Sequence, residues 1–397
     1  MSKLAIFGGQ PVREQKIFYG HQYLDEEDIQ AVVDVLRGDF LTCGPNITSL
    51  EKALCDLTGA KYCIAISNGT AALHVACMAA GVGPGDEVIT TPITFAASAN
   101  CALYCGATPV FADINPETYN IDPEDIERKI TDKTKAVVAV DFTGQAVEIE
   151  KIRAICDKHN LIFIEDGAHS IGTNYNGVPV GGLADMTTFS FHPVKTVTGG
   201  EGGAVLTNDE EIYEKLQLYR SHGITRKESL MEHESEGGWY YEMIDLGYNY
   251  RMTDFQAALI ESQLKKLSAF KARRQEIVKR YNEAFADMPE IFVQKEIPES
   301  DTTRHLYIIN LQLDKLNGTR REVFDALAAE NVQCNVHYIP VYYFPHYERM
   351  GYKKGLCPNA EQAYEGFISI PLYPAMSDQD VEDVIAAIKK VIAHYRK

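Results

Sequence analysis

"FSFHPVKTVTGGEGGAV", residues 189–205, places a lysine between a strand-like run and a cluster of glycines. Lys195 follows the apolar run 186–191 and a proline that stops the strand, so we expect it at the strand's carboxyl end. The glycines permit a tight turn or a close backbone approach and lead into a second strand candidate, "GAVLT". Most lysines are solvated surface residues. The alternative is a desolvated amine held in a pocket for covalent chemistry with a carbonyl group, and the neighbouring motifs must decide between the two.

The composition is that of an ordinary globular protein. The chain has 397 residues, 45% of them hydrophobic, so it can bury a large core and is long enough for two domains. A net charge of −18 and a pI near 5.1 argue against nucleic acid or an anionic membrane surface as a partner. The nine cysteines form no C-x-x-C pair and no cluster with histidine, which predicts no metal site and reduced thiols. With no signal peptide and no apolar stretch of about 18 residues, we expect a cytoplasmic protein that does not span a membrane.

Short β-rich runs alternate with helical patterns along the first half of the chain, which predicts an α/β fold. The runs are nearly continuous in apolar character, as expected for a mostly parallel sheet covered on both faces. In such sheets ligands bind outside the carboxyl ends of the strands. The seven runs are "YCIAIS" (62–67), "EVITT" (87–91), "TPVFADI" (108–114), "KAVVAVD" (135–141), "LIFIED" (161–166), "TTFSF" (187–191) and "GAVLT" (203–207).

A long helical pattern over residues 254–288 leads into a region with two further predicted strands, "HLYIINLQL" (305–313) and "CNVHYIP" (334–340). We therefore expect a large domain over residues 1–265 and a smaller C-terminal α/β domain over residues 266–397. Before the long helix, residues 226–243, "RKESLMEHESEGGWYYEM", are polar and acidic with paired glycines, which predicts a surface loop.

The residues that follow the predicted strands supply groups for an anion. Gly69 and Thr70, in "SNGTAAL", open a predicted helix whose free N–H groups and dipole favour a negative ligand. Taken alone, this motif is more often an ordinary helix cap. Ser190 adds a hydroxyl from a different strand end, close in sequence to Lys195. A phosphate between the two motifs is therefore plausible.

Two more strand ends carry groups suited to a flat, charged ligand. Asp166 and His169 stand in "IEDGAHS", directly after an apolar run, although a lone aspartate there is more often a turn former. Phe95, in "TPITFAAS", is a core aromatic by default, yet at a strand end its ring can stack on a planar ligand. Together with Lys195, these motifs offer a phosphate cradle, a stacking ring, a carboxylate and an amine. A phosphorylated pyridine aldehyde requires that combination.

Five motifs, "SNGTAAL", "TPITFAASAN", "DGAHSIG", "FSFHPVKTVTGGEGGA" and "GYNYRMTDFQAAL", resemble in this order the DegT-type sugar aminotransferases. These are pyridoxal-phosphate enzymes of the aspartate aminotransferase fold type, fold type I. The resemblance spans nearly the whole chain. It implies a large domain with a mostly parallel seven-stranded sheet, a smaller C-terminal α/β domain, and pyridoxal 5′-phosphate as the cofactor.

The resemblance also implies roles for the strand-end residues. Lys195 is expected to form the Schiff base with the cofactor and then to carry the proton during amino transfer. Asp166 is expected to pair with the pyridine nitrogen, Phe95 to stack on the ring and His169 to lie near the phenolic oxygen. Asn249 is expected to reach the phosphate of the neighbouring subunit's cofactor, which implies a homodimer with shared active sites. The residues expected at the phosphate or nearby substrate are Gly69, Thr70 and Ser190.

Within the family, "FSFHPVK", "RSHGITRK" and "VHYIPVYY" are most similar to the branch that aminates C4 of a UDP-linked 4-keto-6-deoxy-N-acetylhexosamine, as in pseudaminic acid biosynthesis. The usual amino donor of the family is L-glutamate. The residues implied for the nucleotide-sugar site are Tyr19, Asp39, Phe40, Leu41, Thr42, Arg226, Lys227, His337, Tyr338, Ile339 and Pro340, with Arg226 and Lys227 near the diphosphate. The competing interpretation of Arg226 and Lys227 is a solvated loop, and that of His337 and Tyr338 is ordinary strand packing.

Several alternatives remain open from the sequence. The substrate sugar can carry dTDP instead of UDP or a keto group at C3, and its configuration is not determined. A related sugar dehydratase replaces the lysine by histidine, whereas this chain keeps Lys195. A non-enzymatic regulator with this fold would be expected to carry a basic DNA-binding module, which the sequence lacks. A nicotinamide enzyme would need G-x-G-x-x-G after the first strand, and "SNGTAAL" does not supply it.

Overall fold

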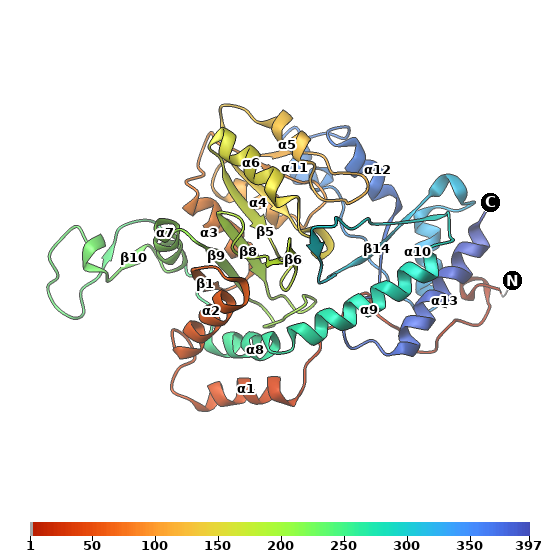
Figure 1. Ribbon diagram of the computed structural model, residues 1–397, viewed down its shortest axis with the longest axis horizontal. Helices are drawn as coiled ribbons and strands as arrows, with labels where there is room; N and C mark the ends of the chain where they lie inside the picture. The colour runs from red at the N-terminus through yellow and green to blue at the C-terminus, as the bar shows by residue number, and fades with distance from the viewer. Residues whose placement is uncertain (1–2) are drawn as a thin grey trace.

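The computed structural model describes residues 3–397 and is built around one large sheet (Figure 1). Its strand order is β1–β9–β8–β5–β4–β2–β3, and only β9 runs antiparallel to its neighbours. Each of the seven predicted runs overlaps one of these strands, so the predicted α/β fold with a mostly parallel seven-stranded sheet is confirmed. The strands are β1 (Tyr62–Ile66), β2 (Glu87–Thr90), β3 (Thr108–Phe111), β4 (Thr134–Val140), β5 (Ile162–Asp166), β8 (Met186–Ser190) and β9 (Gly203–Thr207).

Helices cover both faces of this sheet, which explains why its strands are apolar throughout. Phe163 packs into a core with residues of α2 (Pro45–Thr58), α5 (Pro123–Lys129), α6 (Ile149–His159) and α8 (Asp254–Leu264). The next residue, Ile164, packs into a separate core with α3 (Gly69–Ala79), α4 (Ala97–Tyr104) and α7 (Glu210–Arg220). Successive side chains of a strand point to opposite faces, so a strand covered on both sides needs an apolar residue at every position.

The predicted long helix is two helices. It breaks after α8, and α9 (Leu267–Phe285) continues from there. At the break, Lys266 forms ion pairs with Asp25 and with the buried Asp28, which lies in α1 (Glu26–Arg37). The break therefore lies where the helical segment is tied to the amino-terminal part of the chain. Sequence periodicity alone does not reveal such a long-range tie.

The C-terminal part of the chain has its own sheet, β12–β14–β15, built from β12 (Ile291–Val293), β14 (Tyr307–Leu311) and β15 (Phe367–Ile370). Its core contains residues of α9, α10 (Arg320–Ala329) and α13 (Asp378–Tyr395), together with Leu4 and Ile17 from the amino-terminal segment. Two shorter helices, α11 (Pro345–Arg349) and α12 (Pro358–Gly366), precede β15. The division of the chain at residue 265 stays a prediction.

One of the two predicted C-terminal strands is wrong. The run "HLYIINLQL" contains β14, but "CNVHYIP" is irregular and makes only one isolated bridge, from Asn335 to Ser369. Its side chains turn toward a cavity instead of alternating across a sheet, since residues 335–339 line that cavity. The apolar and β-branched residues that suggest a strand here form part of the wall of this cavity.

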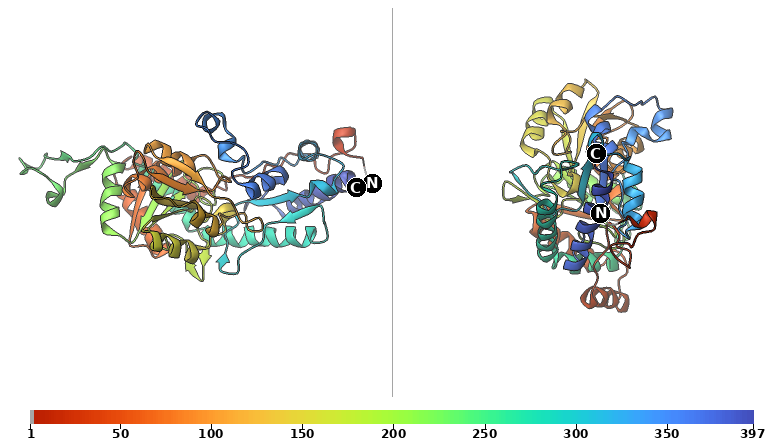
Figure 2. Two further views of the ribbon diagram at one scale, coloured as in Figure 1. Left: turned by 90° about the horizontal axis from the view of Figure 1, so that it is seen from above. Right: turned by 90° about the vertical axis from the view of Figure 1, so that its right-hand side faces the viewer.

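Residues 224–243 form an arm that projects from the body of the molecule (Figures 1 and 2). The strands β10 (Ile224–Thr225) and β11 (Glu242–Met243) pair at its base, and Trp239, the chain's only tryptophan, is 71% exposed within it. The predicted surface loop is thus confirmed. The remaining short strands are β6 (Asn174–Tyr175), β7 (Val178–Pro179) and β13 (Ser300–Asp301).

The sequence predicts neither a membrane-spanning segment nor a metal site, and the structure describes residues 3–397. No helix in that range has the length and apolar character needed to cross a membrane. No group of three or more metal-ligating side chains occurs among the same residues. All nine cysteines are free thiols. Residues 1 and 2, which belong to the amino-terminal stretch expected not to be a signal peptide, lie outside the described range.

The buried carboxylate of Asp254 generates a stability prediction. It accepts hydrogen bonds from the backbone N–H groups of Gly44 and Asn46 at 2.8 and 3.0 Å, while its own N–H donates to the carbonyl of Leu41. Asp254→Ala leaves the two partly buried N–H groups of Gly44 and Asn46 without this acceptor, which should reduce the free energy of unfolding by about 2–4 kcal/mol. Urea denaturation followed by circular dichroism measures the change.

The matched control is Lys52→Ala, which removes an exposed ion pair with Asp56 on the same helix, α2. Exposed pairs contribute roughly 0–1 kcal/mol, so this variant should denature close to wild type. An Asp254→Ala protein as stable as the Lys52→Ala protein contradicts the anchoring role of Asp254.

Candidate active site

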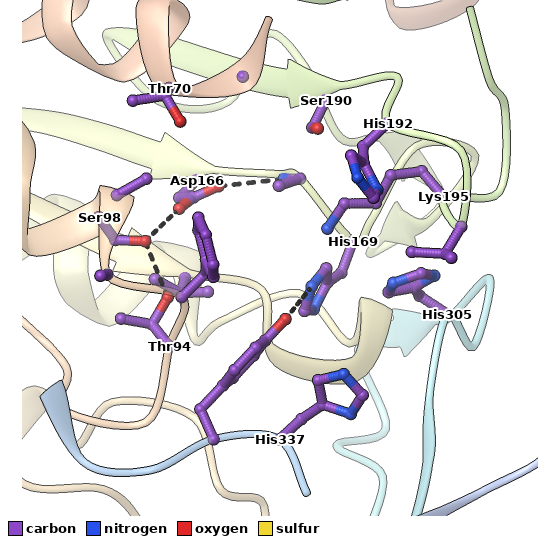
Figure 3. Close-up of a pocket in the computed structure, with 18 of the residues that line it drawn as sticks. Thr70, Thr94, Ser98, Asp166, His169, Ser190, His192, Lys195, His305 and His337 are labelled. Carbon is purple, nitrogen blue, oxygen red and sulfur yellow. Dashed lines mark hydrogen bonds between the residues drawn. The ribbon is translucent and has the colours of Figure 1, made fainter. Parts of the chain in front are cut away.

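A cavity of about 830 Å³ opens where the parallel strands of the large sheet end (Figure 3). Residues that end or follow β1, β2, β4, β5 and β8 line it, and residues 335–339 from the C-terminal part of the chain close one side. The predicted location of a ligand at the carboxyl edge of the sheet therefore coincides with a cavity that is lined by polar side chains. Parallel strands all end at the same edge, so groups far apart in sequence meet there.

Lys195 lies in the turn between β8 and β9 and extends into this cavity (Figure 3). Removal of its amine from water lowers the pKa of Lys195 to about 8, and the negative charge of Asp166 partly opposes that shift. Among the two interpretations that the sequence left open, the geometry favours the enclosed amine. Near pH 8, a substantial fraction of this amine is uncharged and nucleophilic.

Asp166 ends β5 and is 4% exposed. Its Oδ1 accepts from the N–H of Ala168 at 3.1 Å, and its Oδ2 accepts from the hydroxyl of Ser98 at 2.6 Å. Burial raises the pKa of Asp166, while the bonds from Ser98 and Ala168 and the charge of Lys195 oppose the rise. Asp185, the other acid near a strand boundary, is instead paired with Arg153 and does not line the cavity.

Gly69 and Thr70 form the first turn of α3 at the cavity wall. The first N–H groups of a helix have no partner within the helix and favour an anion. A Cβ atom at Gly69 would lie 2.8 Å from the Cβ of Ser190, so only glycine allows this turn to approach the end of β8. The structure thus brings together the two hydroxyl-bearing motifs expected to share a phosphate.

The aromatic and histidine residues form another part of the wall. Phe95 exposes 63% of its surface and lies across the cavity from Tyr338, with ring centroids 6.5 Å apart. The Tyr338 hydroxyl lies 3.2 Å from Nε2 of His169, whose Nδ1 is buried without a partner. Burial lowers the pKa of His169 well below its usual value, so the ring is neutral and Nδ1 carries its proton if Tyr338 donates to Nε2. Nδ1 is then a free donor for a ligand.

The substrate residues implied by the resemblance fall into two groups. Tyr19 and His337 lie side by side with ring centroids 5.1 Å apart, and burial lowers the pKa of His337 to about 4. The expected residues that line the cavity are Tyr19, Gly69, Thr70, Phe95, Asp166, His169, Ser190, Lys195, His337, Tyr338 and Ile339. The expected residues that do not line it in this chain are Asp39, Phe40, Leu41, Thr42, Arg226, Lys227, Asn249 and Pro340.

The residues outside the cavity occupy definite surface positions. Asp39 and Phe40 border a separate cleft between α1 and α8. Arg226, on the arm, stacks over Tyr241 at 5.1 Å. Asn249 pairs with Ser221 through an isolated bridge. Lys227 forms an ion pair with Glu214.

Several cavity residues were not predicted from the sequence. His305 packs 4.5 Å from His169, and Glu201 and His192 border the opening. Ser98 and Thr94 were within reach of prediction, because they stand in the same motif as Phe95. His305 carries no local signal, since only the packing of β14 against the large sheet brings it to the cavity.

A family model matches residues 22–389 of the chain, and its description is the DegT/DnrJ/EryC1/StrS aminotransferase family. The chain belongs to this family. The resemblance inferred from the five motifs is therefore confirmed, as is the prediction of an aminotransferase. Because the match covers nearly the whole chain, it includes both the large sheet and the C-terminal sheet.

Two curated relatives in the DegT/DnrJ/EryC1/StrS family align over almost their full length. The spore coat polysaccharide biosynthesis protein SpsC of Bacillus subtilis is 41% identical over 376 residues, which are 94% of this chain and 96% of SpsC. The UDP-4-amino-4,6-dideoxy-N-acetyl-beta-L-altrosamine transaminase of Campylobacter jejuni is 36% identical over 384 residues, which are 96% of this chain and 99% of that enzyme.

Solved structures agree with the fold. Helicobacter pylori PseC, an aminotransferase involved in the biosynthesis of pseudoaminic acid, superposes with a TM-score of 0.89 and 33% identity, covering 96% of this chain and 100% of PseC. The PLP-form of the putative sugar aminotransferase Spr1654 from Streptococcus pneumoniae superposes with a TM-score of 0.89 and 31% identity, covering 96% of this chain and 99% of that chain.

Enzymes of the DegT/DnrJ/EryC1/StrS family use pyridoxal phosphate, and the residues of this cavity fit that cofactor. The cavity offers an enclosed amine with a lowered pKa, a buried carboxylate, a glycine-opened helix terminus beside a serine, and the unpartnered Nδ1 of His169. These groups match an aldehyde, a pyridine nitrogen, a phosphate and a phenolic oxygen in chemical type. The chemical types of these side chains therefore support pyridoxal phosphate as the cofactor.

The lowered pKa of Lys195 generates a prediction about cofactor attachment. Only the uncharged amine attacks an aldehyde, so the rate of covalent attachment of added pyridoxal phosphate to the apoprotein should rise with pH and level off above about 8. Stopped-flow absorbance measures the rate, and borohydride reduction with peptide mapping identifies the modified lysine.

Lys61→Ala, which changes an exposed lysine, should leave both the rate and the mapped site unchanged. Lys195→Ala should still bind the cofactor without a covalent bond. A label that maps to another lysine in the wild-type protein excludes Lys195 as the attachment site.

Proposed function

We propose that this protein transfers an amino group from L-glutamate to C4 of a UDP-linked 4-keto-6-deoxy-N-acetylhexosamine. The observation that carries the proposal is the enclosed amine of Lys195 beside the buried carboxylate of Asp166 at the carboxyl edge of the sheet. The Campylobacter relative, named as a transaminase of a UDP-linked 4-amino sugar, supports the substrate class. The motifs "FSFHPVK" and "VHYIPVYY" support it as well.

When bound, pyridoxal phosphate supplies an aldehyde carbon and an electron-accepting ring. We assign to Lys195 Nζ the movement of a proton to and from the carbon that carries the amine, a task for which a pKa of about 8 is suited. The negative charge of Asp166 would pair with the pyridine nitrogen of the bound cofactor and keep that nitrogen protonated. His169 donates from Nδ1 to the phenolic oxygen, and Phe95 covers one face of the ring.

The phosphate and the sugar take opposite ends of the cavity in this proposal. Gly69, Thr70 and Ser190 bind the phosphate through the first turn of α3 and the end of β8. The sugar lies against Tyr19 and the residues of the irregular segment 337–339, which together form a wall of three rings and one aliphatic side chain with few charges. This wall would shield the carbon that receives the amine from water.

A second candidate is amino transfer to another nucleotide-linked keto sugar. The observation that favours it is the 41% identity to SpsC, a protein of spore coat polysaccharide biosynthesis, which exceeds the 36% identity to the Campylobacter transaminase. The fold and the cofactor residues are common to both candidates. The difference lies in the residues that contact the sugar and the nucleotide.

The substrate class is tested with a panel of UDP- and dTDP-linked 4-keto and 3-keto sugars and isotope-labelled L-glutamate. We expect the UDP-linked 4-keto-6-deoxy-N-acetylhexosamine to give the highest kcat/KM and a product that has exchanged oxygen for labelled nitrogen, as read by mass spectrometry. His337→Ala should raise KM for the sugar without changing the half-reaction with glutamate, since His337 borders the sugar wall and not the cofactor end. Preferential turnover of a dTDP-linked sugar supports the second candidate instead.

We also propose that the enzyme is a homodimer with shared sites in the cytoplasm, where its free thiols remain reduced. Within residues 3–397, the cavity lining contains Lys195 as its only lysine and no arginine, and it includes the carboxylates of Asp166 and Glu201. A phosphate and a nucleotide diphosphate require more positive charge than this lining provides. Arg226 lies on the projecting arm, from which it can reach a second subunit.

The exposed apolar residues of the amino-terminal segment support the same assembly. Ile29 and Leu36 of α1 are 50% and 57% exposed, and Phe40 and Leu41 continue this surface at 56% and 50%. Side chains of this size are usually covered when they gather on one surface. In a C2 dimer the same surface appears twice, so Asn249 of one subunit can complete the phosphate site of the other.

Shared sites predict complementation between two inactive variants. Lys195→Ala lacks the amine, and Asn249→Asp places a carboxylate against the phosphate of the partner's site. Refolding the two together should restore about one quarter of wild-type activity, because half of the dimers are mixed and each mixed dimer has one intact site. Glutamate-dependent amination of the UDP-linked keto sugar measures it.

The control pair is Lys195→Ala refolded with Asp166→Asn, which should not complement, because both residues belong to one subunit's site and each site of a mixed dimer then keeps one defect. Mixed dimers of the Asn249→Asp pair that form, as seen by native mass spectrometry, yet remain inactive show that Asn249 does not act across the interface.

A further inference from the structure

We propose that Ser98, supported by Thr94, is a positioning residue that aims the carboxylate of Asp166 at the ring nitrogen of the ligand and keeps that carboxylate charged. The proposal rests on the role given above to Asp166. Neither Ser98 nor Thr94 was among the residues expected from the sequence. Their hydroxyl groups lead one after the other to Asp166 (Figure 3).

The direction of this hydrogen-bond chain follows from the number of protons. The Ser98 hydroxyl lies 2.6 Å from Oδ2 of Asp166, which as a carboxylate can only accept, so Ser98 donates its single proton there. The Thr94 hydroxyl, 2.8 Å from the Ser98 oxygen, must then donate to Ser98. Both hydroxyls are buried, at 2% and 3% exposure for the two residues. Successive hydrogen bonds polarise one another, so the bond from Thr94 strengthens the hydrogen bond that Asp166 accepts from Ser98.

The carboxylate of Asp166 is held from two different elements. Ala168, in the turn after β5, donates its N–H to Oδ1 at 3.1 Å, while Ser98 on α4 donates to Oδ2. Two donors on separate oxygens fix the plane of the carboxylate as well as its position. A remaining lone pair of Asp166 then meets the ring nitrogen in one orientation, which is the geometric requirement for a charge-assisted bond.

Ser98 also offsets an unfavourable electrostatic environment. Burial raises the pKa of Asp166, and the Ser98 bond is the largest of the effects that lower it, ahead of Ala168 and Lys195. The charge of Asp166 also acts on three other titratable groups. These are Glu165 on the same strand, Asp141 after β4 and Tyr338 in the segment 335–339. Burial, together with the charge of Asp166, raises the pKa of Glu165 to about 7 and raises the pKa of Asp141 well above its usual value. Without the Ser98 bond, only Ala168 and Lys195 oppose this environment.

The test compares two ligands of the apoprotein that differ in one atom. Pyridoxal phosphate carries the ring nitrogen, and 1-deazapyridoxal phosphate has carbon in its place. In wild type the ratio of their dissociation constants measures what Asp166 contributes through that nitrogen. Ser98→Ala should reduce the preference for pyridoxal phosphate about tenfold, because a hydrogen bond to a charged group is lost. Thr94→Val should reduce it in the same direction by a smaller factor.

The matched control is Thr90→Val. Thr90 is a fully buried threonine at the end of β2 whose hydroxyl has no hydrogen-bond partner, and it does not line the cavity. This substitution should leave the ligand preference unchanged. A loss of folding would weaken the binding of both ligands equally and would leave their ratio intact, so the ratio separates positioning from stability.

A pH profile gives an independent measurement. Loss of the Ser98 bond raises the pKa of Asp166, so the carboxylate takes up a proton at a higher pH as the solution is acidified. The acid limb of the half-reaction with L-glutamate should therefore move up by roughly one pH unit in Ser98→Ala, whereas Thr90→Val should follow the wild-type profile.

Asp166→Asn in the same binding assay separates the role of Ser98 from the role of Asp166. If Asp166→Asn abolishes the preference for pyridoxal phosphate while Ser98→Ala retains the wild-type ratio and pH profile, the role of Ser98 is overturned and that of Asp166 stands. If Asp166→Asn itself keeps the wild-type ratio, the role of Asp166 falls, and the proposal for Ser98 falls with it. A reduced ratio in both Asp166→Asn and Ser98→Ala supports the proposal.

Discussion

The balance between the amine of Lys195 and the carboxylate of Asp166, both removed from water, is the interaction on which the site depends. Burial alone drives each group toward its neutral form, and each charge partly restores the other. Neither can be lost without changing the protonation of its partner. The surrounding neutral histidines add no further positive charge, because burial lowers the pKa of His169, His305 and His337.

This balance requires a scaffold that holds groups from distant parts of the chain at fixed separations. The large sheet provides it, since the ends of its parallel strands meet at one edge while helices bury both faces. The antiparallel strand β9 pairs with β8, so Lys195 lies in the connection, residues 191–202, between two paired strands. Gly69 allows the first turn of α3 to approach Ser190 closely enough for both to face one anion.

Local patterns in the sequence determined most of the large sheet and the cofactor end of the site. Apolar runs bounded by turn residues identified each of its seven strands, and polar residues directly after those runs identified Lys195, Asp166, His169 and Gly69. The strand predictions succeeded, and these four residues line the cavity, because a strand end and a helix start are defined by neighbouring residues. The segment "CNVHYIP" failed for the same reason: its composition is that of a strand, but its side chains form a cavity wall and make only one bridge to β15.

Only the tertiary structure decided which other side chains hold these reactive groups in place. The bond from Ser98 to Asp166 joins residues 68 positions apart, and His305 reaches His169 only because β14 packs against the large sheet. The break between α8 and α9 likewise lies where Lys266 forms ion pairs with carboxylates near the amino terminus. Sequence patterns report the preferences of neighbouring residues, whereas these contacts arise from the packing of distant segments. The chain by itself therefore determined the strands and the reactive groups, and the fold decided how those groups are aimed and how strongly they are charged.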